Sequence, residues 1–157
     1  MDKIKTTEGE LIVRDAKFAI VASRFNEFIV DSLLKAAVRC LTQHGAADTD
    51  IEIVRVPGSF EMPLAVDRLA ASRRFDGIIA LGAVIRGGTP HFEYVAAECV
   101  RGIAAAGMKH GVPIGFGVLT CDTIEQAIER AGTKAGNKGT EATLAVIEMV
   151  NLLRRVD

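Results

Sequence analysis

Aromatic residues are scarce in this chain. They make up 5% of its 157 residues, and tryptophan is absent. Hydrophobic residues nevertheless account for 49% of the sequence, at the high end for a soluble protein, so the core must consist of Val, Ile, Leu and Ala. The length predicts one domain, residues 1–157, with a polar N-terminal arm over residues 1–15 in which residues 11–13 favour a short strand. Apolar residues exceed the needs of one small domain, which indicates contacts between subunits.

The chain also lacks an excess of charge and any long apolar run. Its formal net charge is −1 and it has no basic stripe, which argues against nucleic-acid binding. The N-terminus has no apolar core of a signal peptide, and no apolar run could span a bilayer, so we expect no membrane contact.

Cysteine is sparse and unpatterned. Cys40, Cys99 and Cys121 form no Cys-x-x-Cys pair, which is typical of reduced thiols in a cytoplasmic protein. We interpret Cys40 and Cys99 as small core residues. No pair of His, Asp or Cys has the spacing of metal ligands, so we predict no metal site.

Apolar periodicity predicts alternating strands and helices. Strands are expected at residues 18–22, 51–56, 77–85 and 113–120. Helices are expected between Asn26, as the cap, and Gly45, and then at 60–71, 92–109, 123–130 and 140–154. A glycine-rich link over residues 132–139 precedes the last helix. This order predicts an α/β fold with a parallel sheet and helices on both faces.

Unusual residues follow every predicted strand, and the carboxyl ends of parallel strands meet at one edge of a sheet, where α/β proteins bind ligands. These segments are Phe25-Asn26, residues 58–61, residues 86–91 and residues 120–122. Exposed aromatic rings at Phe25 and Phe60 could stack on a planar ligand, although packing against a helix would also explain them. Glu61 is equally consistent with a helix N-terminus.

His91 lies after a two-glycine turn, Gly87-Gly88-Thr89, and at the start of a helix. Backbone N–H groups in such a turn favour an anion. The helix dipole disfavours imidazolium at this position, which leaves a neutral ring able to take or give a proton. Position alone is equally consistent with a surface histidine on a loop.

The segment 132–140 superficially resembles a nucleotide-binding P-loop. Its lysines have the wrong spacing, and it lies between two helices rather than after a strand, so we reject that interpretation. It remains either a structural turn or a basic loop that serves a neighbouring subunit. By itself, Arg130 is typical of a solvated charged helix face.

Four segments, in this order and spacing, resemble the lumazine synthase family. They are Ser23-Arg24-Phe25-Asn26, residues 56–61, Leu81 to Tyr94 and Ile124 to Gly139, and the similarity runs from about Phe18 to Leu153. The resemblance implies a flavodoxin-like, three-layer α-β-α sandwich with a four-stranded parallel sheet in the order 2-1-3-4. It also implies condensation of 5-amino-6-(D-ribitylamino)uracil with 3,4-dihydroxy-2-butanone 4-phosphate to 6,7-dimethyl-8-ribityllumazine, phosphate and water, with no cofactor or metal.

The resemblance further assigns roles to individual residues, with the site between adjacent subunits of a homopentamer. His91 matches the proton-transferring histidine, and Gly88 and Thr89 match the phosphate-binding loop. The uracil substrate would contact Phe25, Ser59, Phe60, Glu61, Ala83, Val84 and Ile85 of one subunit. The neighbour would bring Phe116, Lys138 and Arg130, with Arg130 on the phosphate.

Assembly beyond the pentamer is also implied. A short glycine-rich link such as residues 132–139 accompanies the family members that form icosahedral shells of sixty subunits, which can enclose riboflavin synthase. Two other classes remain open from the residues alone: a catalytically idle lumazine-binding protein and a container protein. His91, Arg130 and Lys138 favour the enzyme, because binding or assembly alone does not require a proton carrier beside a phosphate site.

Overall fold

The computed structural model describes residues 3–157. Four strands, β1 (Phe18–Ser23), β2 (Ile51–Val56), β3 (Gly77–Ile85) and β4 (Ile114–Cys121), form one sheet in the order β2-β1-β3-β4. Every neighbouring pair in it is parallel. The predicted strand order and direction are therefore confirmed.

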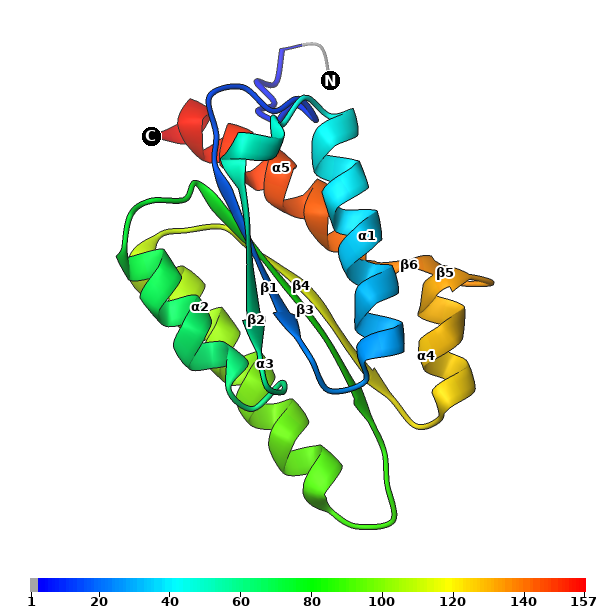
Figure 1. The fold of residues 1–157 in the computed structure, drawn as a ribbon. Helices are drawn as coiled ribbons and strands as arrows, with labels where there is room; N and C mark the ends of the chain where they lie inside the picture. Colours follow the sequence, from blue (N-terminus) through cyan, green and yellow to red (C-terminus); the bar gives the residue numbers. More distant parts are fainter. Residues whose placement is uncertain (1–2) are drawn as a thin grey trace.

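Helices cover both faces of this sheet. They are α1 (Glu27–Gln43), α2 (Met62–Ala71), α3 (His91–His110), α4 (Ile124–Arg130) and α5 (Lys138–Val156), and a 3-10 turn, η1 (Asp48–Asp50), precedes β2. Helices α2 and α3 lie on one face and α1, α4 and α5 on the other, which gives the predicted three layers (Figure 1). None of the helices in residues 3–157 combines the length and apolarity that crossing a bilayer requires.

Alternate residues of the central strands supply two separate cores. In β1, Phe18 and Ile20 pack with α1 and α5, whereas Ala19 and Val21 pack with α2 and α3. All six residues of β1 are buried, as expected of a parallel strand with helices on both sides. Hydrophobic burial on both faces therefore fixes the register of β1 between β2 and β3.

Three local predictions need correction. Asn26 precedes α1 but its side chain makes no cap; its backbone is left-handed, with φ 61°, and its amide bonds elsewhere. The link 132–139 contains a small antiparallel hairpin, β5 (Ala131–Thr133) and β6 (Gly136–Asn137). Helix α5 begins at Lys138 rather than residue 140, because the Asn137 side chain accepts bonds from the first helical N–H groups.

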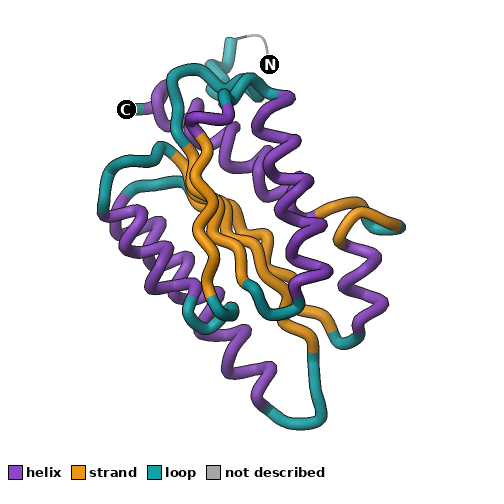
Figure 2. The backbone as a smooth tube through the Cα atoms, in the orientation of Figure 1, coloured by secondary structure: helices purple, strands orange, loops and turns teal. Residues whose placement is uncertain are grey.

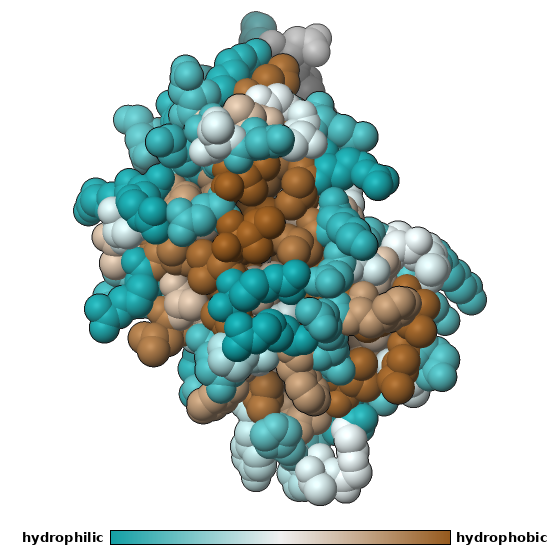
Figure 3. All heavy atoms as spheres, viewed as in Figure 1, coloured by the Kyte–Doolittle hydropathy of each residue, from teal (hydrophilic) through white to brown (hydrophobic). Residues whose placement is uncertain are grey.

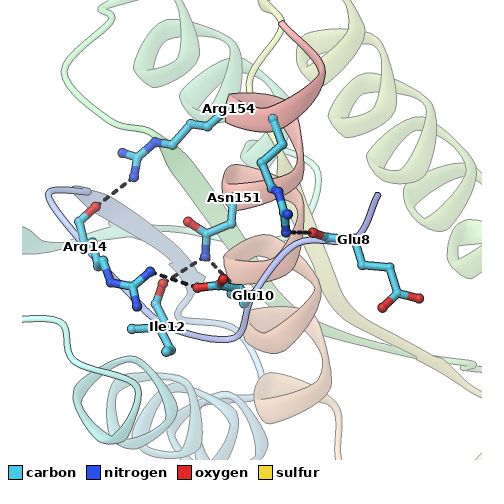
Figure 4. A network of polar contacts seen from close by, with 7 residues as sticks. Glu8, Glu10, Ile12, Arg14, Asn151 and Arg154 are labelled. Atoms are coloured by element: carbon cyan, nitrogen blue, oxygen red, sulfur yellow. Dashed lines mark hydrogen bonds and ion pairs between the residues drawn. The ribbon is translucent and has the colours of Figure 1, made fainter. Parts of the chain in front are cut away.

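The arm contains no strand at residues 11–13; it lies along the end of α5 instead (Figure 4). Asn151 Nδ2 donates to the carbonyl oxygens of Glu10 and Ile12, at 2.6 and 2.8 Å. Arg154 donates to Arg14 O and Asp15 O, and Arg155 donates to Glu8 O. These bonds satisfy backbone acceptors that a strand would have paired with a neighbouring strand.

Glycine allows α5 to lie close against β4. A Cβ added at Gly115 would clash with the backbone carbonyl of Ala142 in α5. Gly115→Ala should lower the free energy of unfolding by about 1–3 kcal/mol, because backbone cannot move aside as a side chain can. Urea unfolding at equal protein concentration measures this difference.

The matched control for that substitution is Gly87→Ala. Gly87 has open space where a Cβ would lie, and its φ is outside the left-handed region. Stability should be unchanged or slightly raised in this variant. Equal stability of the two variants would contradict the close packing of α5 on β4.

Candidate active site

A cavity of about 260 Å³ opens at the carboxyl edge of the sheet. It lies between the ends of β1, β2 and β3 and the first turns of α3, and the long loop from β3 to α3 extends beyond the sheet beside it (Figure 2). The residues that line it are Phe25, Asn26, Ser59, Ala83, Val84, Ile85, Gly87, Thr89, His91, Phe92 and Val95. The predicted convergence is therefore confirmed for the segments that follow β1, β2 and β3, whereas residues 120–122 after β4 do not line this cavity.

The wall of the cavity formed by β3 is apolar and largely buried. Ala83 and Val84 are buried at the end of this central strand, and Ile85 is half-buried. Asn26 Nδ2 donates to Ala83 O at 2.8 Å, which ties the turn after β1 to β3. Sequence reasoning placed Asn26 in a segment at this edge and as a helix cap, but it did not predict the bond to β3. Its left-handed backbone, which Asn tolerates better than most residues, is visible only in the structure.

Phe25 and Phe60 are strongly exposed, at 72% and 62%. Packing against a helix, the alternative explanation for both rings, is therefore wrong. Phe25 lines the cavity, where its face is available for stacking on a planar group. Phe60 and Glu61 lie outside the lining, in the turn before α2, whereas Ser59 is buried and reaches the cavity.

His91 is exposed at the first position of α3, after the predicted glycine turn. Added Cβ atoms at Gly87 and Gly88 would meet nothing within 4 Å, and neither residue has a left-handed φ. The fold of one chain therefore does not require glycine at either position. Close approach of something from outside the chain, such as a ligand, is the remaining steric reason for a glycine. The free N–H groups and the start of α3 suit an anion.

Gly88 is also absent from the lining, and three further predicted residues lie on other elements away from the cavity. Phe116 on β4 is 43% exposed and lines a separate apolar hollow of about 700 Å³ between α3, β4 and α5. Arg130 Nη1 donates to the carbonyl of Gln126 in its own helix at 3.0 Å. Lys138 Nζ pairs with Glu141 Oε2 at 2.6 Å. One chain by itself thus brings neither of these cations to His91.

Arg86 and Asp122 belong to segments that the sequence placed at this edge, but the cluster that forms around Arg86 was not predicted. Its guanidinium pairs with Asp122 and Glu93 and lies 4.5 Å from the centre of the Phe92 ring. Hydrogen bonds to Asp122 and then to Glu93 raise the pKa of Arg86. The sequence offered one signal, a charged residue directly after a buried strand.

The chemistry of the remaining polar groups is limited. Burial raises the pKa of the Cys121 thiol, which keeps it protonated and unreactive at neutral pH. Within residues 3–157, no three His, Cys, Asp or Glu side chains gather closely enough to hold a metal ion. The arrangement as it stands offers an apolar wall, an exposed aromatic face, an anion-binding turn and one imidazole.

Known proteins resemble this chain over almost its whole length. Residues 15–154 match the profile of the 6,7-dimethyl-8-ribityllumazine synthase family. A 6,7-dimethyl-8-ribityllumazine synthase of Halorhodospira halophila is 58% identical over 155 residues, 98% of this chain and 99% of the relative. One from Syntrophus aciditrophicus is 61% identical over 150 residues, 96% of this chain and 97% of the relative. With its parallel sheet order and its ligand-sized cavity at the expected edge, the chain belongs to the 6,7-dimethyl-8-ribityllumazine synthase family.

Proposed function

We propose that the cavity beside His91 is where this chain carries out the reaction of its family. That reaction is the penultimate step of riboflavin biosynthesis, and the chain is a transferase. It condenses 5-amino-6-(D-ribitylamino)uracil with 3,4-dihydroxy-2-butanone 4-phosphate. The observation that carries the proposal is the convergence of Phe25, Ser59, the end of β3, Thr89 and His91 on one cavity.

The uracil substrate occupies the part of the cavity nearest β1 and β3. Its planar ring stacks on the exposed face of Phe25, against the apolar surface of Ala83, Val84 and Ile85. Ser59, Phe60 and Glu61 follow β2 and contact the ribityl chain and the ring. The hydroxyl and carboxylate suit the polyol, which carries both donors and acceptors.

The phosphate of the second substrate binds at the turn before α3. Gly88 and Thr89 offer backbone N–H groups there, and the helix dipole favours the negative charge. Arg130 of the adjacent subunit completes this anion site with charge-assisted hydrogen bonds. Phe116 and Lys138 of that neighbour close the uracil side.

Proton transfer is the main chemical task of the residues. The 5-amino group adds to the ketone and water leaves, phosphate is eliminated, a second carbonyl forms by tautomerisation, and the ribitylamino nitrogen closes the ring with loss of water. Each step moves a proton, and His91 lies between the two substrate subsites to carry it. Holding both substrates together supplies much of the remaining rate. None of these steps needs a metal or a cofactor.

Two uncovered apolar surfaces support assembly into a ring. Hydrophobic side chains gather near the edge strand β2, where Ile53 is 47% exposed (Figure 3). The 700 Å³ hollow that contains Phe116 lies beside β4, at the opposite edge of the sheet. Contact between two different surfaces is heterologous and forms a ring where the rotation between subunits closes, which is the kind of contact that a pentamer with sites between subunits requires.

The proposals on assembly beyond the pentamer and on cellular location also rest on the family resemblance. The short hairpin region of residues 131–137 before α5 suits the icosahedral shell of sixty subunits, which would enclose riboflavin synthase. Residues 1–157 form a single domain with the arm at residues 1–15. The three free, buried cysteines suit a reducing cytoplasm.

The direct test mixes the protein with both substrates and follows the fluorescence of the lumazine product. Sedimentation velocity then measures the assembly. A protein that binds lumazine but forms none would contradict the proposed function and support the idle binding protein.

His91→Ala should lower kcat by about 10²-fold, the lower end of the usual effect of a general acid–base, because orientation of the substrates is retained. Binding of the uracil substrate should change little, since the groups proposed to hold its ring are Phe25, in the turn after β1, and the end of β3, not His91. His44→Gln is the control, because His44 follows the far end of α1. Unchanged turnover in His91→Ala would remove His91 from the mechanism.

Gly88→Ala should raise KM for the butanone phosphate more than KM for the uracil. The added methyl is harmless to the fold, where it meets open space, but it obstructs a phosphate that approaches the backbone closely. Steady-state kinetics with each substrate varied in turn measures both constants. An equal rise in the two constants would refute a phosphate site at this turn.

Mixing inactive variants tests whether neighbouring subunits share a site. Equal amounts of Arg130→Ala and His91→Ala chains, unfolded and assembled together, should place an intact pair at about a quarter of the ring interfaces, because the contact is heterologous. Activity should rise above that of either variant alone. If native mass spectrometry shows mixed rings and activity does not recover, Arg130 does not act across the interface.

A further inference from the structure

The side chain of Arg86 links the two ends of the loop that would bind phosphate and lead to His91. The chain leaves β3 at Ile85, forms the exposed loop 86–90 and returns as α3 at His91. Arg86 stands at the first position of this loop, and its partners Phe92 and Glu93 directly follow His91. One guanidinium group, at the start of the loop, therefore contacts the residues that follow its end.

Three contacts converge on that guanidinium. Arg86 Nη1 donates to Glu93 Oε1 at 2.9 Å, and Nε donates to Asp122 Oδ1 at 2.8 Å. Its Cζ lies over the Phe92 ring, 4.5 Å from the ring centre. The Arg86 backbone N–H also donates to Cys121 O at 2.8 Å, which continues the β3–β4 ladder by one bond. Phe92 in turn lines the cavity.

Geometry distinguishes this cluster from an ordinary surface ion pair. A single exposed pair contributes little, because solvent screens it and two flexible side chains lose freedom. Here one planar guanidinium bonds to two carboxylates on different elements and lies over an aromatic ring. The ammonium group of a lysine could not make this combination of contacts. Arg86 therefore links the end of β3 to α3 and to the turn after β4, which are the elements next to the loop.

We propose that Arg86 is a positioning residue for the reaction: it holds the loop that carries Gly88, Thr89 and His91 in the geometry that binds and releases phosphate. Arg86 acts through these residues and does not touch the substrate. The proposal deepens the proposed function and rests on it. Loss of the Arg86 contacts should make the loop 86–90 more mobile. Phe25, Ser59 and the end of β3 should stay in place, since they lie outside this loop.

The test compares Arg86→Gln and Arg86→Lys with Arg74→Gln in the assembled protein. Arg74 is a matched control at the opposite end of the sheet: it bonds to Glu52 at 3.0 and 3.4 Å and lies 4.7 Å from the centre of the Phe75 ring. Both Arg86 variants should lose about tenfold to a hundredfold in kcat/KM for the butanone phosphate, as small misplacements of reacting groups do. KM for the uracil should stay unchanged, and Arg74→Gln should behave as the wild type.

A second comparison separates geometry from charge. Asp122→Asn retains an oxygen that accepts from Arg86 Nε, so it should keep most of the activity, whereas Asp122→Ala should resemble Arg86→Gln. Combining Arg86→Gln with His91→Ala should lower kcat little beyond His91→Ala alone, because residues that act as one unit are not additive. Full additivity of the two losses would overturn the proposal.

Hydrogen exchange followed by mass spectrometry gives a readout independent of turnover. Peptides that cover residues 86–95 should exchange faster in Arg86→Gln than in Arg74→Gln, with the rest of the chain unchanged. Unchanged exchange and kinetics, or a uniform loss for both substrates with general loosening, would each overturn the proposal. Wild-type protein that forms no lumazine would instead refute the proposed function, and the exchange comparison would still decide whether Arg86 holds the loop.

Discussion

The parallel pairing of β1 between β2 and β3 is the constraint on which the rest of this structure depends. Its register sets Ser23 opposite Val56 and Ala22 opposite Leu81. The chain must then leave all three strands at the same edge, which brings together groups that are far apart in sequence. Burial of β1 on both faces makes a one-residue slip prohibitive, because it would exchange the two cores. The bond from Asn26 to Ala83 O adds a direct link between two of these strand ends.

Much of this arrangement could be predicted from the sequence because it depends on local patterns. Apolar runs of strand length and helical periodicity identified β1 to β4 and the five helices, with boundaries shifted by a few residues. The resemblance to a family supplied the strand order. Convergence of Phe25, Ser59 and His91 then followed from parallel topology alone, without any knowledge of side-chain contacts.

The features that sequence reasoning missed all depend on long-range or conformational detail. Parallel topology placed residues 86–91 and 120–122 at one edge of the sheet, but the pairing of Arg86 with Asp122, 36 residues further along the chain, depends on side-chain geometry that strand order does not give. The left-handed backbone of Asn26 diverts its amide from a helix cap to β3. The hairpin before α5 lies where the sequence predicted a glycine-rich link, either a structural turn or a basic loop, because glycine-rich composition does not specify a two-strand pairing.

The glycines fall into two kinds: those that the packing of one chain requires and those that it does not. Gly115 and Gly139 are closely packed, and a methyl group at either would meet the backbone of a neighbouring element. Gly87 and Gly88 have free space around them, so the isolated fold gives no reason for their small size. The same division applies to charge: Arg130 and Lys138 are occupied by partners on their own chain, whereas the cavity beside His91 receives neither. Under the proposed function, the free space at Gly87 and Gly88 admits a phosphate and the two cations come from the neighbouring subunit, so one chain alone would hold an incomplete site. Catalysis would then be coupled to assembly, because a change at either open edge of the sheet would alter the chemistry without touching His91.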